Sequence, residues 1–227
     1  MSVTTIVINS YKDNNIARTR LIKDLKKQQL FKRINLVVCI GGYVDNETNI
    51  ISQDKNITTI KCNTNSIDYT GFVALLECIK QLNFTPDTKF FYLHDTCATG
   101  SNFLDKLSQI DTRQHDNIRL TTKQSMNIGI YTMRSLIGLS GFILRKTRNT
   151  NQQDVMKYKK LGFNWEDSIF KQTSSHTSIC HHKGVIVEYC DYYSTGTTRQ
   201  VTYYKELDLF KIKSNWTRKT DGSKLSL

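Results

Sequence analysis

The chain has 227 residues and a formal net charge of +12, with 38% hydrophobic and 10% aromatic residues. This length is enough for one α/β domain with a good core, and the aromatic content argues against a disordered chain. No apolar stretch reaches the length of a membrane span, and the start of the chain lacks the pattern of a signal peptide, so we expect a cytoplasmic protein.

Strands and helices are expected to alternate through the first half of the chain. Apolar runs predict strands at 5–9, 34–40, 57–62 and 89–94, and helical periodicity predicts helices at 16–30 and about 67–82. This order predicts a parallel sheet with right-handed crossovers.

The second half has a more mixed pattern. We expect strands at 118–122, 127–131, 141–145 and 185–189, and helices at 102–110, 133–139, 154–161 and 165–172. Residues 192–198 read as a polar loop, and 218–227 as a polar tail.

Residues 89–96, Lys-Phe-Phe-Tyr-Leu-His-Asp-Thr, form the most informative segment. A continuous apolar run of this length is typical of a strand that is buried on both faces. It ends in His94, Asp95 and Thr96, and ligands of open α/β sheets bind at the carboxyl ends of the strands. Asp95 is therefore a candidate for binding a metal, a ribose or a phosphate partner. The alternative is that Asp95 and Thr96 begin a turn or cap the next helix.

Two further segments place polar groups where ligands bind. Asn9, Ser10 and Tyr11 end the first strand, where the tyrosine ring suits stacking on a base; an ordinary strand-to-loop transition is the alternative. Asp68 precedes Gly71 at the start of a predicted helix, where backbone amides favour an anion. The alternative, which is the commoner use of such an Asp, is that Asp68 only caps the helix N-terminus.

Paired carboxylates, Glu166 and Asp167, follow Trp165 at another predicted helix start. A positioned carboxylate can act as a general base, and the indole ring can stack on a sugar. The alternative is that both acids only stabilise the helix N-terminus. Downstream cations, Arg199 above all and also Lys211, are candidates for neutralising a leaving group.

In their order along the chain, these segments resemble the nucleotide-sugar-dependent glycosyltransferases of the GT-A type. The resemblance covers about residues 4–216 as a series of weak motifs. Residues 7–11 are similar to the strand and loop that hold the nucleobase in that family, and 90–96 occupy the place of its Asp-x-Asp motif. Residues 138–145 resemble its acceptor-side strand, and 162–167 its Glu-Asp element. The closing segment, 204–216, is similar to that of small viral or bacterial members, and a virus-encoded member would act in the host cytoplasm.

The resemblance implies an α/β, GT-A (Rossmann-like) fold with a mixed, mostly parallel central sheet flanked by helices. It implies a single domain over residues 1–217 before the tail at 218–227. The implied activity is hexosyltransferase-like: a sugar moves from a nucleotide-diphosphate sugar to a hydroxyl of a glycan or protein-linked glycan, with inversion.

The resemblance also implies roles for individual residues. Asp167, or Glu166 as second choice, would deprotonate the acceptor, and Trp165 would bind it. The donor would be bound by Asn9, Ser10, Tyr11, Asp68, His94, Asp95, Thr96, Arg199 and Lys211.

The segment departs from Asp-x-Asp in having one carboxylate, that of Asp95. Mn²⁺ or Mg²⁺ prefers oxygen ligands and would use Asp95, the diphosphate, waters and His182. A metal-free enzyme would rely on Arg199 and lysine side chains. Both possibilities stay open at this point.

Two other functions remain as alternatives. A sugar nucleotidyltransferase shares the architecture, although the glycine-rich loop that grips a triphosphate is absent from the N-terminal segment. A non-enzymatic basic nucleic-acid-binding protein would explain the charge and would bind oligonucleotides with a steep salt dependence. It would not explain the polar strand ends.

Overall fold

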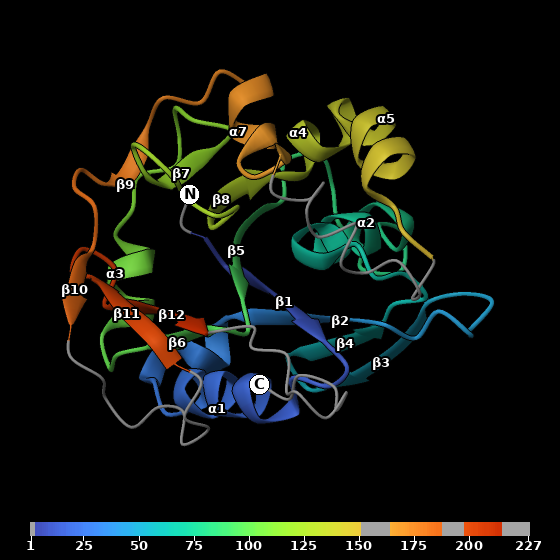
Figure 1. Ribbon diagram of the computed structural model, residues 1–227, viewed down its shortest axis with the longest axis horizontal. Coiled ribbons are helices and arrows are strands. Elements are labelled where there is room, and N and C mark those ends of the chain that lie inside the picture. The colour runs from blue at the N-terminus through green and yellow to red at the C-terminus, as the bar shows by residue number, and fades with distance from the viewer. Residues whose placement is uncertain (1–2, 151–163, 188–197, 215–227) are drawn as a thin grey trace.

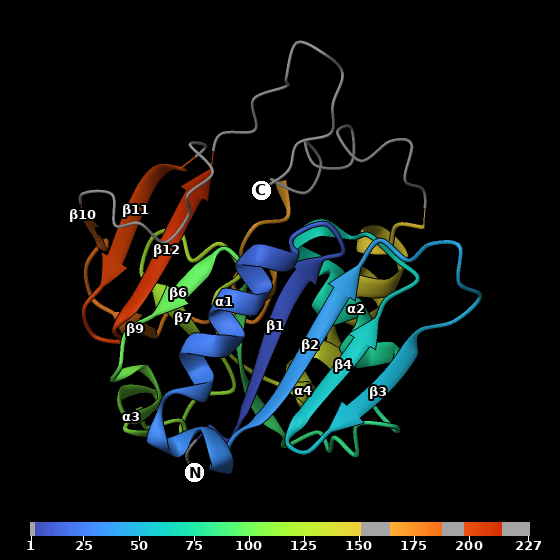
Figure 2. The same cartoon turned by 90° about the horizontal axis from the view of Figure 1, so that it is seen from below.

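The computed structural model describes residues 3–150, 164–187 and 198–214 of the chain. Its main sheet has eight strands in the order β3-β4-β2-β1-β5-β8-β7-β9. The centre of the sheet is parallel and consists of β4 (Ile57–Lys61), β2 (Asn35–Gly41), β1 (Thr5–Tyr11) and β5 (Lys89–His94). The expected mixed α/β fold is therefore confirmed (Figures 1 and 2).

Antiparallel strands extend the sheet on both sides of this centre. On one edge β3 (Ile50–Asp54) pairs with β4. On the other side, β8 (Gly129–Thr132) pairs with β5 and β7 (Ile118–Thr121) pairs with β8. The last strand, β9 (Ser178–Cys180), runs parallel to β7.

Helices cover both faces of the sheet because its central strands bury side chains on both sides. One face is covered by α1 (Asn15–Lys26), η1 (Gln29–Arg33) and α3 (Phe103–Ser108). The other is covered by η2 (Ile67–Tyr69), α2 (Thr70–Glu77), α4 (Met133–Gly138) and α7 (Ser168–Gln172).

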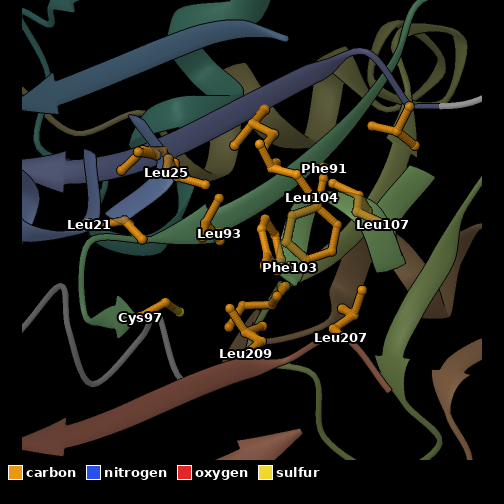
Figure 3. Packing of buried hydrophobic residues seen from close by; sticks show 14 of the residues in the cluster. Leu21, Leu25, Phe91, Leu93, Cys97, Phe103, Leu104, Leu107, Leu207 and Leu209 are labelled. Carbon is orange, nitrogen blue, oxygen red and sulfur yellow. The ribbon is translucent and has the colours of Figure 1, made fainter. Parts of the chain in front are cut away.

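Successive residues of β5 alternate between two hydrophobic clusters, as the period of two in a strand requires. Phe91 and Leu93 pack with the leucines of α1 and with Phe103 of α3 (Figure 3). Tyr92 packs on the opposite face, where its ring stacks on Phe72 of α2 with centroids 3.9 Å apart.

A second, antiparallel sheet has the order β10-β11-β12-β6. Its strands are β10 (Val185–Val187), β11 (Thr198–Tyr204), β12 (Leu209–Ser214) and β6 (Cys97–Thr99). Because β6 begins two residues after Asp95, this sheet is joined directly to the end of β5. The register pairs Lys211 of β12 with Cys97 of β6.

The prediction of a strand at 141–145, which the resemblance gives as the acceptor-side strand, is wrong. This segment is helical, with α5 at Ser140–Phe142 and a π-helical turn, η3, at Ile143–Thr147. Ile143 and Thr147 are both buried, which is the spacing of one helix face. A short apolar run does not by itself distinguish a strand from a buried helical segment.

Some sequence predictions lie outside the described residues: the helix at 154–161, most of the loop at 192–198 and the tail at 218–227. Within the described part of the chain, no helix combines the length and apolar character that crossing a membrane requires.

Candidate functional site

Polar side chains meet at the carboxyl edge of the central parallel strands. Asn9 of β1 lies beside His94 of β5 in the register of the two strands. The amide of Asn9 accepts a hydrogen bond from the backbone N–H of Gly71 at 2.9 Å and donates one to the carbonyl of Ile67 at 3.0 Å. Asn9 therefore fixes the start of α2 against the strand end.

The carboxylate of Asp95 lies buried at the end of β5 and is 4% exposed. Its Oδ2 accepts a hydrogen bond of 2.7 Å from the hydroxyl of Ser10, and that hydroxyl accepts one of 3.0 Å from Nη1 of Arg18. Burial raises the pKa of Asp95, while hydrogen bonds from Ser10 and Asn14 oppose the rise. This carboxylate is thus engaged by side chains of its own chain.

The imidazole of His94 is held between η2 and the loop before β8. Its Nε2 lies 2.9 Å from the carbonyl of Met126, and its Nδ1 lies 3.4 Å from the carboxylate of Asp68. A carbonyl only accepts, so Nε2 carries the proton. Burial lowers the pKa of His94, and the negative charge of Asp68 opposes this effect.

The second sheet brings a cation to the same edge. Lys211 of β12 is 9% exposed, and its Nζ donates a hydrogen bond to the hydroxyl of Thr96. The backbone N–H of the next residue, Ile212, donates to the carbonyl of Thr96 at 3.0 Å. The residue after Asp95 is therefore tied to β12 by both its side chain and its backbone.

Asp167 and Glu166 have different environments although they are adjacent. Asp167 has a left-handed backbone, with φ of 59°, and is 2% exposed. Its carboxylate accepts hydrogen bonds from the backbone of Ser125 (2.7 Å) and Asn127 (2.9 Å), and from Arg119 at 3.2 Å. Both of its oxygens thus hold the loop before β8.

Glu166 is partly buried, and its carboxylate accepts a hydrogen bond from the side chain of Gln124. Burial is the main cause that raises the pKa of Glu166. The negative charges of Asp68 and Asp167 add to the rise, and the positive charge of Lys211 opposes it. The charges of Asp68 in η2 and Lys211 in β12 therefore both act on Glu166.

The aromatic candidates lie on either side of this edge. The ring of Tyr11, at the end of β1, covers Gly42 so closely that a Cβ there would lie 2.5 Å from Cε2 of the tyrosine. Trp165 packs against the cluster under α2, and its carbonyl accepts a 2.7 Å hydrogen bond from Tyr69. Both residues are partly buried.

The structure does not bring all predicted residues together. His182 is exposed and follows β9, which lies three strand positions from β5. Arg199 belongs to β11, but its side chain lies outside the description.

The donor set at Asp95 does not fit a resident divalent cation. Asp95 already accepts hydrogen bonds inside the chain, and cationic side chains, Arg18 and Lys211, act on it. Across residues 3–150, 164–187 and 198–214, no group of three or more His, Cys, Asp or Glu residues could hold a metal ion.

Sequence reasoning missed Arg18, which contacts Ser10, and Arg119, which contacts Asp167. Arg18 lies on α1, whose pattern predicts that arginines and lysines face solvent. The pairing of Arg119 with Asp167 spans 48 residues, and no local signal points to such a contact.

A polar cavity of about 450 Å³ lies elsewhere in the molecule. It is lined by residues 114–117, Ser135 and residues 173–177. Lys89 begins β5 and donates a hydrogen bond to the carbonyl of His115. This cavity therefore lies near the amino-terminal end of β5, opposite to the end that carries Asp95. None of the strand-end residues lines it.

No family model matches the sequence, and no curated protein matches it. Two solved structures of the glycosyltransferase GlyE from Streptococcus pneumoniae TIGR4 are similar in structure. The apo form gives a TM-score of 0.45 at 9% identity, and a second structure gives 0.43 at 12% identity. Each match covers 78% of this chain, which spans 45% of the length of the matched chain.

Proposed function

We propose that this protein is a glycosyltransferase that moves a sugar from a nucleotide-diphosphate sugar to a hydroxyl of a glycan or protein-linked glycan. The observation that carries the proposal is the position of Glu166. Its neighbour Asp167 holds Ser125 and Asn127, which flank Met126, and the carbonyl of Met126 lies 2.9 Å from His94 at the end of β5. Burial raises the pKa of Glu166, and the charges of Asp68 and Lys211 act on it. A base and a cation at one ligand-binding edge are what group transfer to a hydroxyl requires.

Glu166 is a better base than Asp167 on geometric grounds. Both oxygens of Asp167 accept hydrogen bonds from backbone N–H groups, and Asp167 is almost fully buried. Proton abstraction would break those bonds. Glu166 is only partly buried, and its raised pKa makes it a stronger base than an ordinary carboxylate.

The reaction proceeds as a single inverting displacement. The acceptor oxygen forms a bond to the anomeric carbon while the bond from that carbon to the diphosphate oxygen breaks. The hydroxyl proton passes to Glu166, and the electron pair of the broken bond leaves with the nucleoside diphosphate. Trp165 precedes the base and would pack against the acceptor sugar.

The donor lies across the ends of β1 and β5 in this proposal. Tyr11 would stack on the nucleobase, and Asp68 and Asp95 would border the ribose and diphosphate. Asn9 and Ser10 act through the backbone of α2 and through Asp95, so they position the site.

The test is a thermal-shift and calorimetric screen against UDP, GDP, dTDP, CMP and their sugars, beside a single-stranded oligonucleotide. Base-selective stabilisation by one nucleotide or nucleotide sugar supports the transferase. Product analysis with the selected sugar donor and a panel of glycan acceptors then tests transfer. A shift with the oligonucleotide alone, lost as salt is added, would replace this proposal with a nucleic-acid-binding function.

A further inference from the structure

The metal ion that the GT-A resemblance implies would have to be held by Asp95, since the neighbouring positions are His94 and Thr96. Asp95 accepts hydrogen bonds from Ser10 and Asn14. Nε2 of His94 faces a carbonyl at 2.9 Å. Mg²⁺ is held in proteins by one or two carboxylates together with waters and substrate phosphates, and the one carboxylate here is already engaged by Ser10 and Asn14.

Lys211 lies where positive charge is needed. Its strand, β12, pairs with β6, and this pairing places residue 211 beside Cys97, two residues after Asp95. The ammonium group donates to the hydroxyl of Thr96, the residue that directly follows Asp95. Lys211 therefore takes its position from the same turn that carries the single carboxylate.

The ammonium group of Lys211 is in a position to bind an anion. An ammonium group has three N–H donors, and in the part of the chain that the structure describes, Thr96 is the hydrogen-bond acceptor assigned to it. A buried cation with donors to spare is costly unless an anion neutralises it. Its positive charge also acts on Asp95 at the strand end and on Glu166, the proposed base.

We propose that Lys211 takes the place of a divalent cation and binds the diphosphate of the donor without a metal. This inference rests on the proposed function. As the bond between the anomeric carbon and the diphosphate oxygen breaks, the leaving group gains negative charge, and Lys211 neutralises it from a fixed position. The substrate class that follows is a nucleotide-diphosphate sugar whose diphosphate is bound without a metal ion.

The test is calorimetric binding of UDP and GDP, each measured in excess EDTA and again with Mn²⁺. The wild-type protein is compared with Lys211→Met, Lys211→Arg and Lys213→Met. Lys213 is the matched control, since it is exposed on the same strand two residues further along.

We expect the wild-type Kd for the preferred nucleotide to be the same in EDTA and in Mn²⁺. Lys211→Met should weaken binding about 10- to 100-fold, since a hydrogen bond to a charged group is lost. Lys211→Arg should retain most of the affinity, and Lys213→Met should bind as the wild type does.

Three results overturn the inference. An unchanged Kd in Lys211→Met would refute the role of Lys211. Binding that appears only with Mn²⁺ would refute the role of Lys211 and leave the glycosyltransferase proposal standing. Failure to bind any nucleotide diphosphate with or without Mn²⁺ would refute both proposals. The EDTA comparison uses the wild-type protein, so it decides whether binding needs a metal even when Lys211→Met fails to fold.

Discussion

The hydroxyl of Ser10, at the end of β1, donates a 2.7 Å hydrogen bond to Oδ2 of Asp95, which directly follows β5. The two residues are 85 positions apart in the chain. Their contact joins the ends of the two central parallel strands. It also gives a buried carboxylate one of the partners that burial requires.

Ser10→Ala should destabilise the protein by about 1–3 kcal/mol, because it removes a hydrogen bond from a buried carboxylate. That bond lowers the pKa of Asp95, so it favours the ionised form. The loss should therefore be largest above the raised pKa of Asp95 and should shrink as the pH falls through it. Urea unfolding at several pH values measures the effect. Ser52→Ala, at an exposed position of β3, is the control and should change little.

Gly71→Ala should destabilise the start of α2 by about 1–3 kcal/mol. A Cβ at this position would lie 2.7 Å from Cε2 of Tyr92 and 2.8 Å from its hydroxyl oxygen. Tyr92 is fully buried and stacked on Phe72, so its ring has no room to move. Thermal unfolding measures the loss.

Gly138→Ala is the matched control for this change. A Cβ at Gly138, the last residue of α4, meets no atom within 4 Å, so this variant should be neutral or gain up to about 1 kcal/mol. Equal losses in the two variants would contradict the steric argument.

The strands β1, β2 and β5 were predictable because each is a short apolar run that ends in polar or glycine residues. The prediction of β5 at 89–94 matches its observed bounds, Lys89–His94. Strands without such a run were not predicted: β3 is mostly exposed, and β6 and β9 have three residues each. Their pairing depends on residues that are distant in the sequence, and the periodicity of a short segment does not reveal such pairing.

The strand ends were predictable as a group, but individual roles were not. Asn9, Asp95 and their neighbours are candidates because they are polar residues at the carboxyl ends of buried strands. Whether a carboxylate is free or engaged depends on its surroundings in space, as Glu166 and Asp167 show. Asp167 is held by Ser125 and Asn127, which lie 42 and 40 residues earlier in the chain.

Asp167→Asn should therefore lower the stability of the protein, whereas Glu166→Gln should not. Asp167→Asn places an amide NH₂ where backbone N–H groups need an acceptor, so it should cost about 2–4 kcal/mol of stability. Urea unfolding measures this loss, which Glu166→Gln should not share. Full stability in Asp167→Asn would mean that its carboxylate does not hold the loop before β8.

Activity separates the same two variants. If Glu166 is the base, Glu166→Gln should lower kcat by about 10²- to 10⁴-fold while the Kd for the nucleotide changes little. Single-turnover transfer with the selected donor measures the chemical step. Full activity in Glu166→Gln would eliminate Glu166 as the base.

The pH dependence of transfer should report the pKa of Glu166. A general base acts when deprotonated, so kcat/KM should fall as the pH drops through a midpoint above the ordinary value of 4.5. Burial is the main cause of this shift, and the hydrogen bond from Gln124 opposes it.

Asp68 and Lys211 act on Glu166 in opposite directions, so substitutions at these two residues should move that midpoint in opposite directions. The negative charge of Asp68 raises the pKa, and the positive charge of Lys211 lowers it. Asp68→Asn should therefore move the acid limb of the kcat/KM profile to lower pH. Lys211→Met should move the acid limb of its residual activity to higher pH. Lys213→Met should leave the midpoint unchanged. Shifts of the same sign in Asp68→Asn and Lys211→Met would show that a group other than Glu166 limits the rate.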